Sequence, residues 1–183
     1  TSFSMFLSGF ALFAERRFTY DGQPFGPREI GYVFGYVGFL TIILQGGLIG
    51  RLVKRFGEPA LVATGFVTLA LGYFGLGLST SISALLWMAL LASFGIGVIR
   101  PALTSLISQQ ADRREQGVVL GLTQSLTSMA SILAPIVAGL LIEREMLTEW
   151  AWVAAGLAAV GVALSRQGFS LRPTPAANPV VDS

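Results

Sequence analysis

The sequence has no cysteine and no histidine, and only 12% of its 183 residues are charged. Disulfides, thiolate nucleophiles, Cys/His metal sites and catalytic Ser-His or Cys-His pairs are therefore excluded. Neither a phosphate-binding G-x-x-x-x-G-K-S/T loop nor a G-x-S-x-G nucleophile elbow occurs. We therefore expect a protein that is not an enzyme and that uses no metal and no cofactor.

Apolar residues dominate what is present. Hydrophobic residues make up 53% of the chain, glycine contributes 22 residues, and the mean hydropathy is +0.69. Soluble chains carry roughly 25% charged residues, about twice the proportion found here. The net charge of +2 comes from cations dispersed between apolar runs, whereas nucleic-acid-binding proteins cluster their cations. This composition predicts an integral membrane protein that lies in a lipid bilayer and binds no nucleic acid.

Uncharged apolar runs recur along the chain and predict an all-α membrane protein. They cover 1–14, 30–50, 59–99, 116–142 and 150–165. A spanning helix needs roughly 20 residues, so we divide the third run at the polar triplet 79–81 into helices over 60–78 and 82–107. The result is a bundle of six transmembrane helices over 1–165. A polar, proline-rich tail over 166–183 follows, and we expect it to be disordered.

The first predicted helix is incomplete. Residues 1–14 would rise only about 21 Å, short of a hydrocarbon core of roughly 30 Å. The segment has no initiating Met and no basic n-region, which argues against a signal peptide. We therefore expect the beginning of a longer chain to be missing. Arginine and lysine number four on the side that includes Arg16 and seven on the other, so the positive-inside rule places that other side and the C-terminus in the cytoplasm.

Small residues in two predicted helices indicate close packing, because lipid provides no hydrophobic force between helices. In the second helix, Gly31, Gly35 and Gly38 share one face. In the fifth helix, the series consists of Gly121, Ala130, Ala134, Ala138 and Gly139, with Pro135 among them. The alternative to simple packing is a seam along which the helices rock during transport.

Polar side chains divide the predicted helices into two groups. Gln124, Ser128 and Ser131 follow i, i+4, i+7 spacing and line one face of the fifth helix. The other candidates for lining a polar cavity are Ser4 and Ser8 in the first helix and Tyr36 and Gln45 in the second. The first, second, fourth and fifth helices would surround this cavity, with the third and sixth outside. Interhelical hydrogen bonds, worth about 0.6 kcal/mol on average, are the alternative for each Ser and Thr.

Arg100 is a charge inside the fourth predicted helix, about eight residues or about 12 Å from its cytoplasmic end. A charge at that depth costs at least a few kcal/mol unless it is paired or hydrated. Pro101 follows it and removes the hydrogen bond that the Gly97 carbonyl would accept. A guanidinium beside a bend and a free carbonyl suggests a substrate-binding or gating position. The alternative is an arginine that snorkels to the interface.

A loop between the second and third predicted helices resembles a motif of the major facilitator superfamily of transporters. Residues 50–57, Gly-Arg-Leu-Val-Lys-Arg-Phe-Gly, resemble its cytoplasmic loop G-x-x-x-D-R-x-G-R/K-R/K, with matches at Gly50, Arg55 and Gly57. Lys54 stands where the family has Asp, and the basic pair that ends the motif is replaced by Glu and Pro. These departures suit the degenerate copy of the loop in the second half of such transporters.

Two further stretches carry the same resemblance. Residues 100–107, which begin with Arg-Pro, and the charged segment 112–121 resemble the tenth helix and the loop after it. The stretch from Gly121 to Gly139 resembles the antiporter motif G-x8-G-x3-G-P-x2-G-G, with Pro135 in place and alanine at several glycine positions. In the family this motif is diagnostic in the fifth helix, and here it would be the corresponding repeat in the eleventh.

The resemblance implies the C-terminal half of such a transporter, helices seven to twelve, nearest to the drug-efflux branch that includes tetracycline-resistance proteins. The two halves of these transporters are parallel repeats around a site near the membrane midplane. The first and fourth helices of this chain would then line the cavity, the second and fifth would flank it, and the third and sixth would lie outside. The resemblance also implies a bacterial inner membrane, and as partners the missing N-terminal half, a small-molecule substrate and protons.

The function that follows is proton-coupled efflux of small amphiphilic molecules by alternating access. Arg100 would be an electrostatic element of the cavity, and Pro101 and Pro135 would be bending points. No acidic residue lies within a predicted helix, so we expect the proton-binding carboxylate in the missing half; Glu15 and Glu29 lie at the outer rim. Two alternatives stay open: uptake of a sugar, organic acid or peptide by the same fold, and a non-transporting module that packs against other membrane helices.

Overall fold

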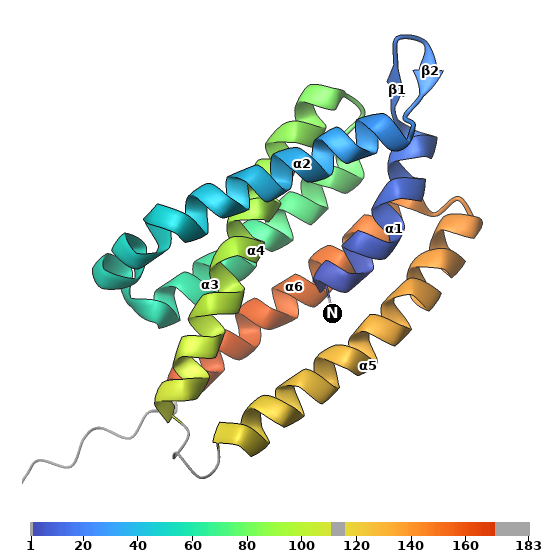
Figure 1. Cartoon of the computed structure of the whole chain (residues 1–183). Coiled ribbons are helices and arrows are strands. Elements are labelled where there is room, and N and C mark those ends of the chain that lie inside the picture. Colours follow the sequence, from blue (N-terminus) through green and yellow to red (C-terminus); the bar gives the residue numbers. More distant parts are fainter. Residues whose placement is uncertain (1, 111–115, 171–183) are drawn as a thin grey trace, which may run out of the picture.

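The computed structural model describes residues 2–110 and 116–170 as a bundle of long helices that run side by side (Figure 1). The elements are α1 (Ser2–Arg17), β1 (Thr19–Tyr20), β2 (Gln23–Pro24), α2 (Pro27–Ile43), the π-helical turn η1 (Leu44–Leu48), α3 (Ile49–Leu78), α4 (Ile82–Gln110), α5 (Gln116–Glu143) and α6 (Leu147–Ser170). The helix α6 continues past the predicted end of the bundle at 165, and residues 171–183 of the predicted tail lie outside the described part.

Four segments are long and apolar enough to cross a bilayer: Pro27–Leu78, Ile82–Leu106, Gly117–Glu143 and Leu147–Ser165. The first has 52 residues, about twice what one crossing requires. It is broken at Gly57, whose φ of 76° and ψ of 156° only glycine adopts readily. If the parts before and after Gly57 are counted separately, the described residues form six helical rods, and the predicted all-α membrane fold is confirmed.

A β-hairpin joins α1 to α2, and the apolar runs do not predict it. Its two strands pair antiparallel, with Thr19 opposite Pro24. The turn between them consists of Asp21 and Gly22, both with positive φ, and Asp-Gly is a favoured pair for such a two-residue turn. We call this end of the bundle the hairpin end (Figure 1). The opposite end, where the chain passes from α2 through η1 into α3 and bends at Gly57, is the Gly57 end.

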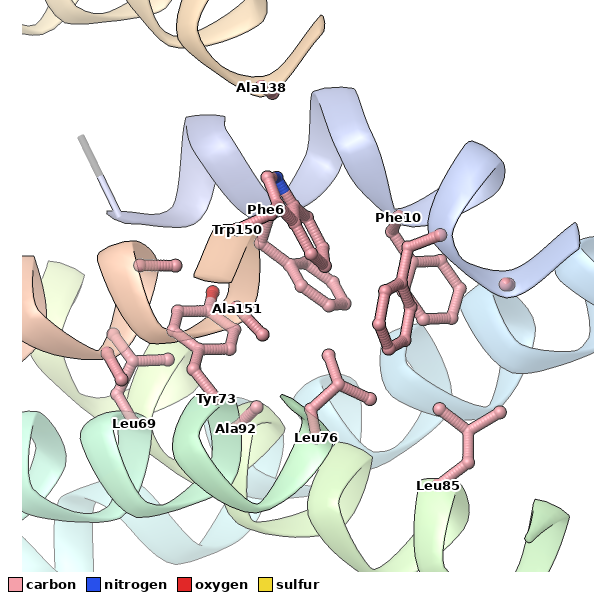
Figure 2. Close-up of a cluster of buried hydrophobic side chains, with 14 of the residues drawn as sticks. Phe6, Phe10, Leu69, Tyr73, Leu76, Leu85, Ala92, Ala138, Trp150 and Ala151 are labelled. Carbon is pink, nitrogen blue, oxygen red and sulfur yellow. The ribbon is translucent and has the colours of Figure 1, made fainter. Parts of the chain in front are cut away.

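An aromatic cluster holds α1 against α3 and α6. Phe6 of α1 stacks on Tyr73 of α3, with ring centroids 5.1 Å apart, and Phe13 contacts Trp150 of α6 at 5.1 Å. Figure 2 shows Phe6, Tyr73 and Trp150 lying together between the three helices. Gly9 makes room for the indole, because a Cβ there would overlap Trp150. The short helix α1 is therefore fixed by aromatic stacking and shape, although it is shorter than a full crossing.

The helices α3 and α4 approach each other with their backbones in contact. A Cβ at Gly95 would lie 2.6 Å from the carbonyl oxygen of Gly65, and a Cβ at Gly72 would lie 2.9 Å from the backbone nitrogen of Ala92. Such close approach through small residues is the usual source of attraction between helices in lipid. The sequence predicts small-residue packing at Gly31, Gly35 and Gly38 instead, but no described atom lies within 4 Å of where their Cβ atoms would be.

Two adjacent arginines at the end of α1 bind the ends of two other helices. Arg16 Nη1 donates to the carbonyl of Ile142 in the last turn of α5 at 2.6 Å. Arg17 donates through Nε to the carbonyl of Ser79 at 3.2 Å and through Nη2 to that of Gly77 at 3.3 Å, both at the end of α3. The last carbonyls of a helix have no partner within the helix and carry partial negative charge, so cations stabilise them. These contacts join α1, α3 and α5 at the hairpin end.

The α3–α4 contact gives a stability prediction. Gly95→Ala should lower the free energy of unfolding by about 1–3 kcal/mol, because the added methyl group meets backbone that cannot move aside. Gly156→Ala on α6 is the matched control, since a Cβ there meets no described atom within 4 Å. Unfolding by sodium dodecyl sulfate in mixed micelles, followed by circular dichroism, measures both. Equal stability of the two variants would contradict this packing.

Candidate functional site

The strongest candidate site lies where α2 and η1 cross α4. Pro101 of α4 has no backbone N–H, so the carbonyl of Gly97, one turn earlier, lacks its helical partner. Gln45 of η1 supplies one: its Nε2 donates to the Gly97 oxygen at 3.4 Å. The neighbouring Leu44 lies directly against Gly97, where a Cβ would come within 2.6 Å of Leu44 Cδ2. The sequence indicates the free carbonyl, and the structure shows that a second helix satisfies it.

The local backbone positions Gln45 for this contact. Residues Leu44–Leu48 form a π-helical turn, which accommodates one more residue than a regular α-helical turn. The segment also contains Gly46 and Gly47, where an added Cβ would meet no described atom within 4 Å. Such π turns occur frequently at functional sites in helices. Sequence periodicity did not reveal this one, although two adjacent glycines after a glutamine in an apolar helix are a usable signal.

Arg100 follows the crossing on α4. It comes three residues after Gly97, its side chain is exposed, and its carbonyl accepts a hydrogen bond from Thr104 Oγ1 at 3.0 Å. Gln45 of η1 therefore binds α4 at a carbonyl that lies within one turn of Arg100. Among the other cavity candidates, Tyr36 is half-buried on α2. The side chains of Ser4 and Ser8 lie outside the described residues.

The polar stripe of α5 does not join this region. Figure 1 shows α1 between α2 and α5, and α5 packs chiefly against α1. Gln124, Ser128 and Ser131 are exposed, and the Ser131 hydroxyl donates to the carbonyl of Thr127 at 3.0 Å. The hydroxyls of Thr123, Ser125 and Thr127 bond in the same way to carbonyls four residues earlier. The stripe thus lies on a face that the described helices leave uncovered.

The predicted packing residues of α5 behave in two ways. Ala134 is buried together with Ala130 and Ala138, and this alanine stripe faces the rest of the bundle. Gly121 and Gly139 are exposed, and no described atom comes within 4 Å of a Cβ built on either. Pro135 is exposed as well, inside a helix that continues to Glu143. Packing within the described chain therefore accounts for the alanines and leaves the two glycines and the proline unexplained.

The sequence predicts a loop over residues 50–57, but the structure places 50–56 in the first turns of α3 and breaks the helix at Gly57 alone. Gly57 makes the turn, Gly50 is exposed, and the Arg55 guanidinium lies 5.4 Å from the centroid of the Phe56 ring. Glu58, which departs from the family motif, accepts a hydrogen bond from Ser105 Oγ of α4 at 3.1 Å. The sequence did not predict this contact, because a residue that differs from the family motif gives no indication of which side chain it will bind. The turn is thereby attached to the same helix that carries Gly97 and Arg100.

Comparison with known proteins agrees with this architecture. The family model of the Major Facilitator Superfamily matches residues 1–182. The tetracycline resistance protein, class C, of Escherichia coli is 36% identical over 131 residues, which cover 69% of this chain and 30% of that protein. Multidrug resistance protein 2 of Bacillus subtilis is 29% identical over 140 residues, 75% of this chain and 33% of that protein. Solute carrier family 22 member 18 of mouse is 26% identical over 113 residues, 62% of this chain and 28% of that protein.

The chain spans about a third of the length of these relatives. The match to the family model extends over nearly all of its residues, and the predicted resemblance to the drug-efflux branch is confirmed by relatives named for tetracycline and multidrug resistance. Its apolar helices are those of an integral membrane protein. The chain belongs to the major facilitator superfamily, a family of transporters rather than of enzymes.

Proposed function

We propose that this chain is part of a secondary active transporter that exports small amphiphilic molecules by alternating access, driven by the proton gradient. The observation that carries the proposal is the crossing of η1 and α4, where Gln45 binds the carbonyl that Pro101 leaves free, three residues before Arg100. The tetracycline and multidrug resistance proteins among the relatives favour efflux over uptake. The Gly97 carbonyl is thereby bound by a side chain of another helix in place of the backbone N–H of its own helix.

We further infer that the chain forms the C-terminal half of the transporter, with residues 1–165 as helices seven to twelve and 166–183 as a cytoplasmic tail. The missing N-terminal half would cover the open faces of α2 and α5. Support comes from the exposure of large apolar side chains on those faces, such as Ile42 at 71% and Val118 at 73%. The excess of arginine and lysine at the Gly57 end favours a cytoplasmic location of that end in a bacterial inner membrane.

In this mechanism each named residue has a separate role. Arg100 would hold a positive charge in the cavity, where low dielectric makes its attraction for polar or anionic groups of a substrate strong. Gln45 would hold α2 and α4 together in one state and release the Gly97 carbonyl in another. Gln124, Ser128 and Ser131 would contact substrate or the opposite half, with Ser4, Ser8 and Tyr36 lining the cavity and Pro135 bending α5. The proton-binding carboxylate would belong to the other half.

Replacement of Arg100 tests the transport function. In the complete protein, Arg100→Ala should slow the efflux of tetracycline or of a lipophilic dye from whole cells at least about tenfold, equivalent to about 1.4 kcal/mol. Arg100→Lys, which keeps the charge, should retain part of the activity. Arg144→Ala is the control, because Arg144 is an exposed cation between α5 and α6. If Arg100→Ala and Arg144→Ala export at the same rate, the assigned role of Arg100 is wrong.

A double-mutant cycle tests the contact between Gln45 and Gly97. Gln45→Leu should lower the free energy of unfolding by about 0.6–1 kcal/mol, because the Gly97 carbonyl loses its partner. In the Pro101→Ala background the same change should have little effect, since Ala provides the backbone N–H that proline lacks. Unfolding in mixed micelles measures all four proteins. An identical loss in both backgrounds would show that the carbonyl freed by Pro101 is not what Gln45 stabilises.

A further inference from the structure

A cationic surface at the Gly57 end has no part in the mechanism above. Arg51, Lys54 and Arg55 follow i, i+3, i+4 spacing in the first turns of α3, so they share one side of the helix, and all three side chains are exposed. On the opposite side, Leu52 and Val53 pack against a buried apolar cluster of α3 and α4. The three cations, which we call the basic face, therefore point away from the bundle.

The position of the basic face along the chain places it at the edge of the hydrocarbon. Residues 30–50 carry no charge, and as a helix they rise about 31 Å, close to the roughly 30 Å of a hydrocarbon core. Arg51 is the first charged residue after this run. At Gly57 the chain bends, and the rest of α3 returns to the hairpin end (Figure 1). The basic face thus lies at the level of the lipid headgroups.

The positive charge of the basic face is not neutralised within residues 2–110 and 116–170. No carboxylate there forms an ion pair with any of its three cations. Glu58, the nearest acidic residue in the sequence, lies beyond the break at Gly57 and accepts a hydrogen bond from Ser105 of α4. The departure from the family motif adds to this charge, because Lys54 stands next to Arg55 where the motif has Asp.

We propose that the basic face binds the headgroup of an anionic phospholipid, for which phosphatidylglycerol is the simplest example. Guanidinium groups match the oxygens of a phosphodiester, and lysine adds attraction as a point charge. Basic residues beside a membrane-spanning helix are attracted to anionic lipids. Phosphatidylethanolamine also carries a phosphate, but its ammonium group would meet three like charges. This binding goes beyond transport, because it requires neither alternating access nor a proton gradient.

An exposed aromatic ring beside the cations favours a lipid over a soluble phosphate ester. Phe56 is 55% exposed, and its ring centroid lies 5.4 Å from the Arg55 guanidinium. A ring in this position can contact the glycerol and upper acyl region of a lipid whose phosphate is held by the neighbouring arginine. A soluble phosphate ester would use the charges and leave the ring without a partner.

Native mass spectrometry of the complete protein, released from micelles that contain one phospholipid, measures the affinity for the first lipid bound. Phosphatidylglycerol should bind at least about threefold more tightly than phosphatidylethanolamine with the same acyl chains. Lys54→Gln should weaken phosphatidylglycerol about threefold to fivefold. Lys54→Asp, which restores the residue of the family motif, should weaken it about tenfold or more. Neither change should alter unfolding in mixed micelles, because the side chain is exposed.

A matched control separates a defined site from general attraction between opposite charges. Arg144→Gln also removes one exposed cation, but at the hairpin end, between α5 and α6, and it should change the affinity by less than about twofold. Equal weakening by Lys54→Gln and Arg144→Gln would overturn the proposal, and so would equal affinity for the two lipids. Displacement of phosphatidylglycerol by millimolar glycerol 3-phosphate would show that the basic face takes a soluble phosphate ester and not a lipid.

Discussion

A backbone carbonyl that has no partner within its own helix needs another donor, and this constraint explains most of the polar contacts between the described helices. Pro101 frees one carbonyl within α4, and Gln45 occupies it. The ends of α3 and α5 free several more, and Arg16 and Arg17 bind three of them. On α5 the hydroxyls return to the carbonyls of their own helix. Among the described residues, the long polar side chains that join two helices therefore donate mainly to backbone carbonyls.

The two ends of α4 differ in their neighbours. Near the Gly57 end, Gly95 and Gly97 allow α3 and η1 to lie directly on the backbone, so that segment is closely packed. At the hairpin end, Leu86 is exposed and the space between α2 and α4 opens into a pocket.

Much of the fold could be predicted from the sequence, because apolar length and polar interruptions directly determine which residues can be helices in lipid. The break at 79–81, the turn near Gly57 and the free carbonyl at Gly97 were all accessible in this way. The packing partners of each helix could not be predicted, because periodicity defines a face of the helix but not the residues that cover that face. Gly31, Gly35 and Gly38 form a smooth face with no described neighbour, whereas Gly72 and Gly95 join α3 to α4. The hairpin had a local signal in Asp21-Gly22, but the apolar runs on either side obscured it.

The neighbouring guanidinium groups of Arg16 and Arg17 reach different helices, and this has a mechanical consequence. The two arginines at the end of α1 bind the ends of α3 and α5, so α1 cannot slide past either helix without breaking charged hydrogen bonds. These three helix ends are therefore held together at the hairpin end. The first turns of α2 and α4 take no part in these hydrogen bonds, and residues of both helices line the pocket at the same end. Movement of α1 against α3 or α5 at this end would therefore break charged hydrogen bonds, whereas movement of α2 against α4 would break none of these three.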